Sequence, residues 1–254
     1  MLFTMDNVGY AYSRRNGFHL GPFSLSIEAH KITALVGSNG SGKTTLIRIL
    51  IQELVKFTGE YRVDNIAVRD LTGGFLHRFG IGYAPENPVL DEKLSGYETL
   101  SIIKEMKSID DTAFSEQVLE FRKHLQLGSW FDTVPCEECS QGMRRKISLT
   151  VALLCASSYL IIDEPTNGLD PLAVIGLKQL MSTYAKKGRG VLVSSHMLDF
   201  VEKIAEQIII LKDGALAYTG TVSQLLENNP GNALDEIYYE LFTSNLKTVP
   251  GSSL

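Results

Sequence analysis

Short apolar runs recur along this chain, with helix-like segments between them. Residues 32–36, 81–83, 159–162, 190–194 and 208–211 are apolar almost throughout, which is typical of strands buried on both faces of a sheet. Segments with helical periodicity follow several of these runs, at residues 46–54, 172–186 and 198–205. This alternation of strands and helices predicts an α/β fold built on a parallel sheet.

Segments near the two ends of the chain follow other patterns. Residues 3–8 and 23–27 alternate apolar with polar side chains, so we expect two antiparallel strands there. After the last core strand, Lys212-Asp213-Gly214 has the composition of a hairpin turn. A short helix is expected near residues 223–227 and an amphipathic turn or two at 234–242. Residues 244–254 are polar and are expected to fray.

The stretch from about Asn87 to Val151 carries helical signals and little strand signal. Its expected helices span residues 97–107, 112–127 and 141–154. A helical insertion between strands of one sheet is expected to form a subdomain. The sequence therefore predicts four parts: the first part of a nucleotide-binding core at 1–86, a helical subdomain at 87–151, the second part of the core at 152–228, and a C-terminal extension at 229–254.

The composition narrows the class of protein. The chain has 254 residues, 44% hydrophobic and 21% charged, as in a globular protein. Its formal net charge of −5 gives no overall basic field, so we expect no nucleic-acid partner. The longest apolar stretch, residues 151–162, is shorter than the ~20 residues of a spanning helix, and the N-terminus does not read as a signal peptide. Three cysteines fit a reducing cytosol, and the C-x-x-C pair Cys136 and Cys139 has no second pair at zinc-ligand spacing.

The first candidate for chemistry is the phosphate loop, residues 37–45 (GSNGSGKTT), which matches G-x-x-x-x-G-K-[ST] between a predicted strand and a predicted helix. Its glycines let backbone N–H groups curl around an anion, and the helix directs the positive end of its dipole to the same point. Lys43 adds a cation for the β- and γ-phosphates, and Thr44 adds a hydroxyl for Mg²⁺. A plain Gly/Ser turn is the alternative, but the flanking elements favour a nucleoside triphosphate site.

A pair of carboxylates, Asp163 and Glu164, ends the apolar run at 159–162. Ligands gather at the carboxyl ends of parallel strands, so Asp163 is expected beside the phosphate loop, where it would hold Mg²⁺. Glu164 would then act on the water that attacks the γ-phosphate, as a general base or by positioning it. A polar turn that merely ends a strand is the alternative.

Two further motifs point to a family. Residues 139–146 (CSQGMRRK) look like the family signature L-S-G-G-Q in its L-S-x-G-M variant, and Ser195-His196 looks like a switch histidine after a strand. With these motifs the chain resembles, over nearly its whole length, the nucleotide-binding subunits of ATP-binding cassette (ABC) transporters. Cys139 and Gln141 depart from the strict signature. The resemblance implies a P-loop NTPase (RecA-like) core with an inserted all-helical subdomain.

The resemblance also assigns roles to residues around the signature. Ser140 and Gly142 open a helix and so provide a second anion-binding N-terminus with a hydroxyl. In the family this end binds the ATP of a partner subunit, so that two ATP molecules are sandwiched in a head-to-tail dimer. A plain helix N-cap is the alternative for Ser140. Asp170, in Gly168-Leu169-Asp170, looks like part of the loop that crosses the dimer interface.

Three more positions take their roles from the resemblance. Tyr12 looks like the aromatic residue that stacks on adenine, with Tyr10 as the alternative and a plain strand aromatic also open. Glu86 stands where most members have a glutamine that contacts Mg²⁺ or the attacking water and couples to the membrane subunit. His196 would hydrogen-bond the γ-phosphate, although a lone histidine after a strand is otherwise more often structural.

The predicted site residues are listed here by role. Those expected to contact ATP are Tyr12, Gly37, Ser38, Asn39, Gly40, Ser41, Gly42, Lys43, Thr44, Thr45, Ser140 and Gly142. Those expected at Mg²⁺ are Thr44, Asp163 and Glu86, and those expected in catalysis are Glu164, His196 and Glu86.

The sequence therefore predicts an ATPase that uses ATP and Mg²⁺ to drive transport, more often export than import, through permease subunits supplied by other chains. It is expected to work as a homodimer or heterodimer of cassettes, in the cytoplasm and peripheral on the inner face of the membrane. A soluble ABC ATPase, such as one that assembles iron–sulfur clusters, is the alternative enzyme. A nucleotide-gated scaffold with a dead site is the non-enzymatic alternative, against which Lys43, Asp163, Glu164 and His196 argue. The transported substrate and the identity of the partner cassette stay open.

Overall fold

The computed structural model describes residues 1–12, 17–71 and 73–243. The chain divides into two units, the first made of Met1–Phe75 and Leu192–Leu254 and the second of Leu76–Val191. The strand β8 (Gly190–Ser195), buried at every position, begins in the second unit and continues into the first.

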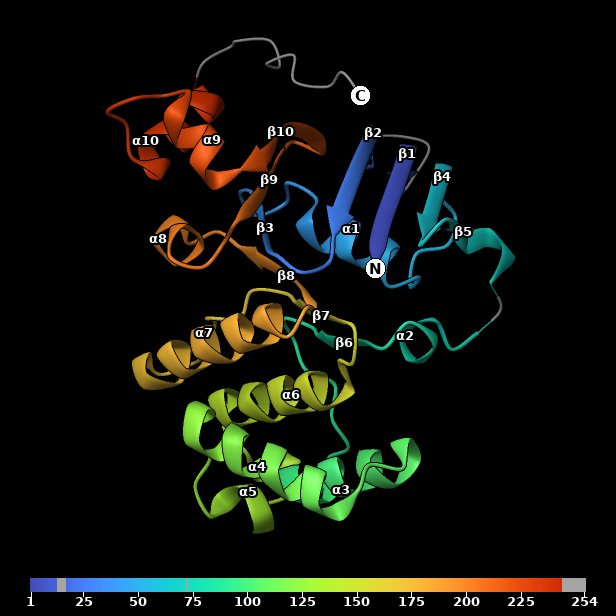
Figure 1. Cartoon of the computed structure of the whole chain (residues 1–254), viewed down its shortest axis with the longest axis vertical. Coiled ribbons are helices and arrows are strands. Elements are labelled where there is room, and N and C mark those ends of the chain that lie inside the picture. The colour runs from blue at the N-terminus through green and yellow to red at the C-terminus, as the bar shows by residue number, and fades with distance from the viewer. Residues whose placement is uncertain (13–16, 72, 244–254) are drawn as a thin grey trace. The chain divides into compact units, whose positions relative to one another are not determined.

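An antiparallel sheet of order β2-β1-β4-β5 forms the N-terminal part of the first unit. Its strands are β1 (Leu2–Ala11), β2 (His19–Glu28), β4 (Thr58–Val63) and β5 (Ile66–Ala67), and Figure 1 shows β1, β2 and β4 as adjacent arrows. Phe3 lies opposite both Ile27 of β2 and Val63 of β4, and all three side chains are buried. The alternating pattern of the first two strands therefore predicted their antiparallel pairing correctly.

The parallel pair β3 (Ile32–Val36) and β9 (Gln207–Lys212) lies under the phosphate loop in the first unit, with Val36 beside Ile210. β9 turns through Asp213 and Gly214, at φ 49° and 80°, into the antiparallel strand β10 (Ala215–Thr221), so the predicted hairpin turn is confirmed. The helices of this unit are α1 (Lys43–Leu50), α8 (Leu198–Glu202), α9 (Val222–Glu227) and α10 (Leu234–Thr243).

Helix α1 ends four residues before the predicted limit of Leu54. Gln52 adopts the left-handed conformation at φ 61°, and the N–H of Leu54 donates to the carbonyl of Arg48 at 3.0 Å. This bond closes the helix with a left-handed C-terminal turn that apolar periodicity does not reveal. The prediction for α8 was likewise too long, since that helix ends at Glu202.

The second unit is mainly helical. Its main helices are α3 (Gly96–Lys107), α4 (Asp111–Leu125), α6 (Gln141–Cys155) and α7 (Pro171–Lys186), and its parallel strands are β6 (Ile81–Ala84) and β7 (Tyr159–Ile162). Figure 1 shows α3, α4 and α6 together with the short α5 (Trp130–Thr133). N-caps at Ser95, Asp110 and Ser140 fix where the three predicted helices begin.

Close backbone contacts hold this unit together. A Cβ on Gly82 of β6 would lie 1.9 Å from the carbonyl oxygen of Ala152 in α6, and one on Gly176 of α7 would lie 1.8 Å from that of His124 in α4. The unit consequently includes β6, β7 and α7 as well as residues 87–151. The four-part division drawn from the sequence stays a prediction, and these wider bounds are the ones that the contacts support.

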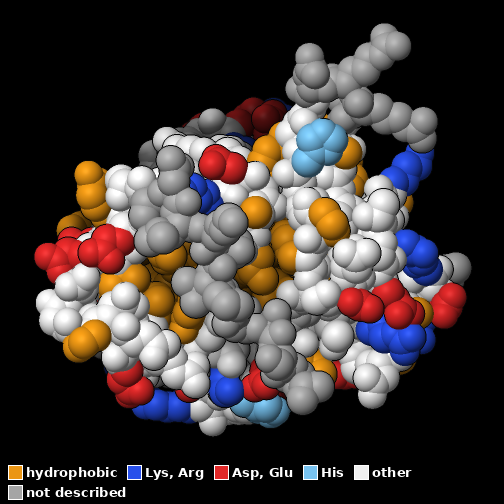
Figure 2. Space-filling view, turned by 90° about the horizontal axis from the view of Figure 1, so that it is seen from above, with side chains coloured by type: hydrophobic (Ala, Val, Ile, Leu, Met, Phe, Trp, Pro, Cys, Tyr) orange, Lys and Arg blue, Asp and Glu red, His pale blue; other side chains and the backbone are white. Residues whose placement is uncertain are grey.

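Some elements had no clear sequence signal. They are β4, β5, β10, α2 (Phe75–Arg78), α5 and the 3-10 turns Val68–Asp70 and Cys136–Glu138. Residues 244–254, expected to fray, lie outside the described residues. Among the helices in the described ranges, none is both long enough and apolar enough to cross a bilayer. On the face seen in Figure 2, acidic and basic side chains are interspersed with apolar ones.

Candidate functional site

The phosphate loop wraps the start of helix α1. Gly42, the N-cap residue, has φ 109°, and no side chain caps the helix there. This φ favours glycine, and a Cβ on Gly42 would also lie 2.6 Å from Cδ1 of Leu20. An uncapped helix N-terminus offers its N–H groups and its positive dipole end to an anion. The local structure therefore fits a phosphate group.

Lys43 folds back over its own loop. Its Nζ donates to the carbonyl oxygens of Gly37 at 2.8 Å and Ser38 at 3.3 Å, and the residue is only 6% exposed. Ser38, Asn39, Gly40 and Thr44 are exposed around the loop. The ammonium is thus held at the loop, and the open rim can admit a triphosphate.

Ser41 and Gly37 form the floor of the loop. A Cβ on Gly37 would lie 2.3 Å from Ser41 Oγ and 2.6 Å from the carbonyl of Leu211, so the floor has no room for a side chain. Ser41 is 1% exposed, and its Oγ has no hydrogen-bond partner among the described residues. The N–H of Gly214 in the β9–β10 turn donates to the Ser41 carbonyl at 3.0 Å and supports the loop from below.

Tyr12 lies beside the first turn of α1. Its hydroxyl is 3.3 Å from Oγ1 of Thr45, its ring packs edge-on against Tyr10 at 4.9 Å, and half of its surface is exposed. Tyr12, the first of the two tyrosines considered for adenine stacking, therefore lies within hydrogen-bond distance of the phosphate loop. Sequence reasoning missed Phe18, whose Cζ would lie 3.0 Å from a Cβ on Gly42. Phe18 directly precedes β2, and no motif marked it in the sequence.

His196 directly follows the buried strand β8. Ser195 is fully buried, and its Oγ accepts the N–H of Met197 at 3.0 Å. This short turn leaves the His196 side chain on the exposed side of the strand end. A contact between His196 and a γ-phosphate remains a prediction.

In the second unit, Asp163 and Glu164 follow β7. The N–H of Asp163 donates to the carbonyl of Ala84 at 2.9 Å, which is the last bond between β7 and β6. Asp163 is 1% and Glu164 4% exposed. Glu164 has φ 47°, a left-handed conformation that a non-glycine residue adopts at a cost and that often marks functional positions.

Glu86 is exposed at the end of β6 and is held by a neighbour. Nδ2 of Asn167 donates to Glu86 Oε1 at 3.1 Å, and the N–H of Asn167 donates to the Glu164 carbonyl at 3.3 Å. The structure thus brings the predicted Glu86 and Glu164 segments together through Asn167. Asn167 belongs to no motif used in the sequence interpretation and was missed.

Arg145 is a second missed residue and is fully buried at 1% exposure. Its guanidinium donates to the carbonyls of Pro85, Asp163 and Glu164. Burial lowers the pKa of Arg145 to about 10, although Asp163, Glu86 and Glu164 act in the opposite direction. Its place inside the signature-like segment, residues 139–146, was the signal that the sequence offered.

The signature-like segment opens helix α6. Ser140 is exposed and its Oγ accepts the N–H of Met143 at 3.2 Å, so Ser140 is the N-cap, and its hydroxyl hydrogen can still be donated to a ligand. A Cβ on Gly142 would lie 2.6 Å from the Gly168 carbonyl. The small residue therefore allows the start of α6 to lie against the loop after β7.

Asp170 has partners within its own chain. It caps α7 by accepting the N–H of Ala173 at 2.9 Å, and Lys146 Nζ donates to its Oδ2 at 2.6 Å. The Lys146 hydrogen bond, aided by the cap, holds the pKa of Asp170 below its ordinary value. A role at a dimer interface stays a prediction beside this structural role.

The predicted residues fall into two sets. The first unit contains the phosphate loop, Tyr12 and His196, and the second contains Asp163, Glu164, Glu86, Ser140, Gly142 and Asp170. Each set is brought together within its unit as described. That both sets act on one nucleotide remains a prediction.

The oxygen ligands named for Mg²⁺ suit that ion, because Mg²⁺ prefers a few protein oxygens completed by phosphates and water. Thr44 is exposed on the first turn of α1, and Asp163 lies at the buried end of β7. Within the described residues, no cluster of three or more His, Cys, Asp or Glu could hold a metal alone. Cys136 and Cys139 are free thiols whose pKa values are raised, mainly by burial.

Comparison with known proteins gives consistent matches. A family model described as ABC transporter matches residues 20–167. The chain is 33% identical over 224 residues to the ABC-type transporter ATP-binding protein EcsA of Bacillus subtilis (strain 168), covering 86% of this chain and 88% of that protein. It is 28% identical over 212 residues to the lantibiotic transport ATP-binding protein SrtF of Streptococcus pyogenes, covering 84% and 87%. A solved ATP-binding subunit of an ABC transporter has a TM-score of 0.84 at 27% identity, covering 95% of this chain and 99% of that one.

Proposed function

The chain belongs to the ABC transporter family as an ATP-binding, ATP-hydrolysing subunit with the P-loop NTPase fold, and on that premise we propose that it powers export through separate permease subunits. The observation that carries the nucleotide part is the uncapped start of α1, with Lys43 held at the carbonyl of Gly37.

We assign the chemistry as follows. The phosphate loop binds the triphosphate, and Tyr12 stacks on the base. Thr44, Asp163 and Glu86 hold Mg²⁺, which supplies charge stabilisation at the phosphates when bound. Glu164 activates or orients the attacking water.

A second cassette completes the arrangement in this proposal. The exposed hydroxyl of Ser140 and the N-terminus of α6 would face the γ-phosphate of a nucleotide bound to a partner subunit. The γ-phosphate then stabilises the closed pair, and hydrolysis releases it, because a ligand shifts an equilibrium only by its differential affinity.

The permease contact is proposed on the helical part of the second unit. Val89 is 94% exposed, and on α3 Ile102 is 47% and Met106 77% exposed, which is unusual for large apolar side chains so close in sequence. Ile102 also lines a hollow of about 360 Å³, together with Tyr97, Ser101, Lys104, Glu105, Asp111, Phe114 and Ser115.

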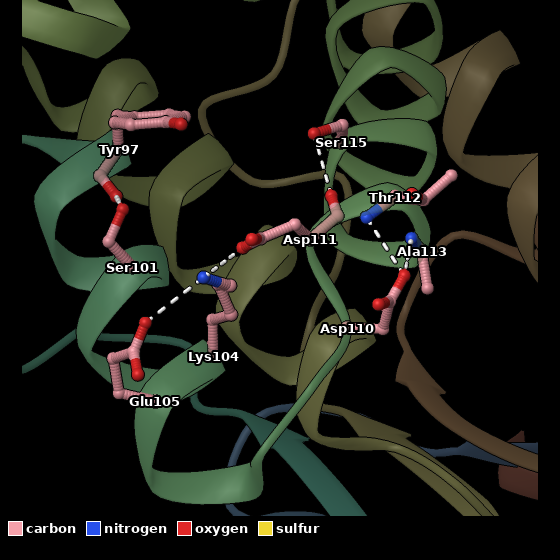
Figure 3. A network of polar contacts seen from close by, with 9 residues as sticks. All are labelled: Tyr97, Ser101, Lys104, Glu105, Asp110, Asp111, Thr112, Ala113 and Ser115. Carbon is pink, nitrogen blue, oxygen red and sulfur yellow. Dashed lines mark hydrogen bonds and ion pairs between the residues drawn. The ribbon is translucent and has the colours of Figure 1, made fainter.

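Figure 3 shows the polar edge of this hollow. Lys104 of α3 forms ion pairs with Asp111, at the start of α4, and with Glu105 at 3.0 Å. Hydrogen bonding to Asp111 and Glu105 raises the pKa of Lys104. An apolar face with a charged edge suits a short cytoplasmic helix of a membrane protein.

The export direction rests on the relatives and on the signature variant. The Streptococcus protein is named for lantibiotic transport. The L-S-x-G-M form at Ser140–Met143 also resembles export subunits. Export predicts that cells carrying Lys43→Ala become more sensitive to peptide antibiotics, whereas import predicts a growth defect on a limiting nutrient.

The permease contact is tested by membrane binding. The chain, expressed in the cells that naturally produce it, should sediment with membranes and crosslink to a protein with several spanning helices, identified by mass spectrometry. Val89→Asp with Met106→Asp should release it, while Val55→Asp, at a side chain that is also 61% exposed but lies in the first unit, should not. A chain that stays in the soluble fraction and crosslinks to cluster-assembly proteins would favour the alternative ATPase.

A further inference from the structure

The strands β6 and β7 separate at the point where the predicted catalytic residues begin. Their last ladder bond joins the N–H of Asp163 to the carbonyl of Ala84. Pro85, Asp163 and Glu164 lie beyond the ends of β6 and β7, and their carbonyls accept hydrogen bonds from a side chain outside the sheet. Buried carbonyl groups need donors from elsewhere.

Arg145 supplies those donors from helix α6. Its guanidinium donates to all three carbonyls, with the Glu164 bond at 3.0 Å. The planar fork of an arginine can satisfy several acceptors in one fixed arrangement, which a lysine cannot. Nε of Arg145 has no hydrogen-bond partner among the described residues, so the side chain is committed to these carbonyls through its two terminal nitrogens.

The hydrogen bond from Arg145 to the Glu164 carbonyl is made to a residue with an unusual backbone conformation. Glu164 has φ 47° and is 4% exposed, and a left-handed glutamate persists only where its surroundings enforce it. Its carbonyl accepts from both Arg145 and the N–H of Asn167. These two donors fix the peptide that sets the direction of the Glu164 side chain.

Helix α6 is a fixed base for Arg145. Gly82 brings β6 against α6 so closely that a Cβ would clash with the Ala152 carbonyl, and Gly142 lies against Gly168. Lys146, next to Arg145, holds Asp170 at the far end of the loop after β7. The first turns of α6 therefore contact this loop at several points along its length.

We propose that Arg145 is a positioning residue for ATP hydrolysis: its bonds to the carbonyls of Pro85, Asp163 and Glu164 hold the backbone of Glu164 so that the Glu164 carboxylate keeps its reactive direction. The proposal rests on the catalytic role given to Glu164 under the proposed function. Arg145 donates to backbone carbonyls, so it acts through the position of Glu164 and is not itself a catalytic residue.

The test is steady-state ATP hydrolysis by the purified full chain carrying Arg145→Met. We expect kcat to fall roughly 10- to 100-fold, the effect of misplacing a reacting group by about 1 Å, while KM for ATP stays within about twofold. Arg189→Met is the matched control, because Arg189 also donates to a backbone carbonyl, that of Ala156 at the other end of α6. It should keep the parental kcat.

A double-mutant cycle separates positioning from general support of the fold. Added to Glu164→Gln, Arg145→Met should change the residual single-turnover rate by less than about threefold, because both changes act through one carboxylate. Arg145→Lys retains the charge with fewer aligned donors, so it should give an intermediate kcat at unchanged KM. If Arg145→Met does not fold, the measurement is made on Arg145→Lys.

Parental kcat in Arg145→Met or Arg145→Lys overturns the proposal, as does a raised KM at unchanged kcat or a full further loss in the Glu164→Gln background. Failure of the underlying function has a different result: Glu164→Gln itself would then hydrolyse ATP at the parental rate.

Discussion

The ammonium group of Lys43 lies 2.8 Å from the carbonyl oxygen of Gly37, the first residue of the loop that the lysine closes. This bond is buried, so the cation is held at the floor of the loop and does not extend into solvent. Lys43 therefore stabilises the loop, and under the proposed function it also binds the nucleotide.

Lys43→Ala should remove most ATP affinity. A hydrogen bond to a charged group is worth about 1.5–3 kcal/mol, so affinity should fall by roughly 10- to 100-fold or more in titration with a fluorescent nucleotide. The Gly37 carbonyl also loses a buried donor, so the free energy of unfolding should fall by about 1–2 kcal/mol. Lys56→Ala, at an exposed lysine, is the control. Near-parental ATP affinity in Lys43→Ala would refute the assignment of the loop.

Pairing should depend on the γ-phosphate. Because Ser140 keeps a hydroxyl hydrogen available while it caps α6, it can donate to a partner's nucleotide. Sedimentation of Glu164→Gln should therefore show dimers with ATP and monomers with ADP. Ser140→Ala should weaken the ATP-dependent dimer. The same distribution with both nucleotides would leave Ser140 as a helix cap only.

The sequence predicted the elements whose patterns are local. The apolar runs predicted both ends of β3 and of β7 correctly. The N-caps at Ser95 and Ser140 lie where helices were expected to begin. The predicted end of α1 was wrong by four residues, because the left-handed conformation of Gln52 leaves no pattern in the sequence. Strand β4 was missed because it mixes glycine and charged residues.

Sequence motifs identified most of the proposed site residues, but they did not identify the residues that hold them in place. Asn167 and Arg145 act through long-range hydrogen bonds, to Glu86 and to the carbonyls after β6 and β7, that join segments far apart in the chain. Such contacts follow from tertiary packing and leave no periodicity to read. Asp170 also gained a structural role, toward Lys146, that its motif did not suggest.

Asp170→Asn should destabilise the chain in a pH-dependent way. The folded pKa of Asp170 is lowered, so its contribution is present above the unfolded pKa of about 4 and is lost as pH falls through the folded value. Asp170 is 46% exposed, so the effect should be at most about 1 kcal/mol. Asparagine can still cap the helix, so the substitution removes the charge of residue 170 and keeps its N-cap hydrogen bond. Urea unfolding should show a larger difference at pH 7 than at pH 3. Asp199→Asn, at an exposed position, is the control, and an equal difference at both pH values contradicts this account.

Gly176→Ala should loosen the contact between α7 and α4. The added Cβ would lie 1.8 Å from the His124 carbonyl, a backbone atom that can move only if the helices separate. We expect a loss of about 1–3 kcal/mol in the free energy of unfolding. Ile175→Ala, at the preceding and 54% exposed position, should be nearly neutral. An unchanged urea midpoint in Gly176→Ala would show that the two helices are not in this contact.

We propose Glu164 as the catalytic carboxylate of this ATPase. Glu164→Gln keeps the size of the side chain and removes only its charge and basicity, so ATP should bind at least as well. Asp163→Asn should differ, because it weakens the Mg²⁺ site and therefore productive binding. Both variants need a nucleotide-binding assay beside the rate measurement.

The most direct measurement is the steady-state rate of ATP hydrolysis by Glu164→Gln at saturating ATP and Mg²⁺. We predict a fall of about 10²–10⁴-fold, which corresponds to roughly 3–5 kcal/mol of activation free energy, with ATP affinity retained. Hydrolysis at the parental rate would contradict the account, and Glu86, held by Asn167 at 3.1 Å, would become the next candidate.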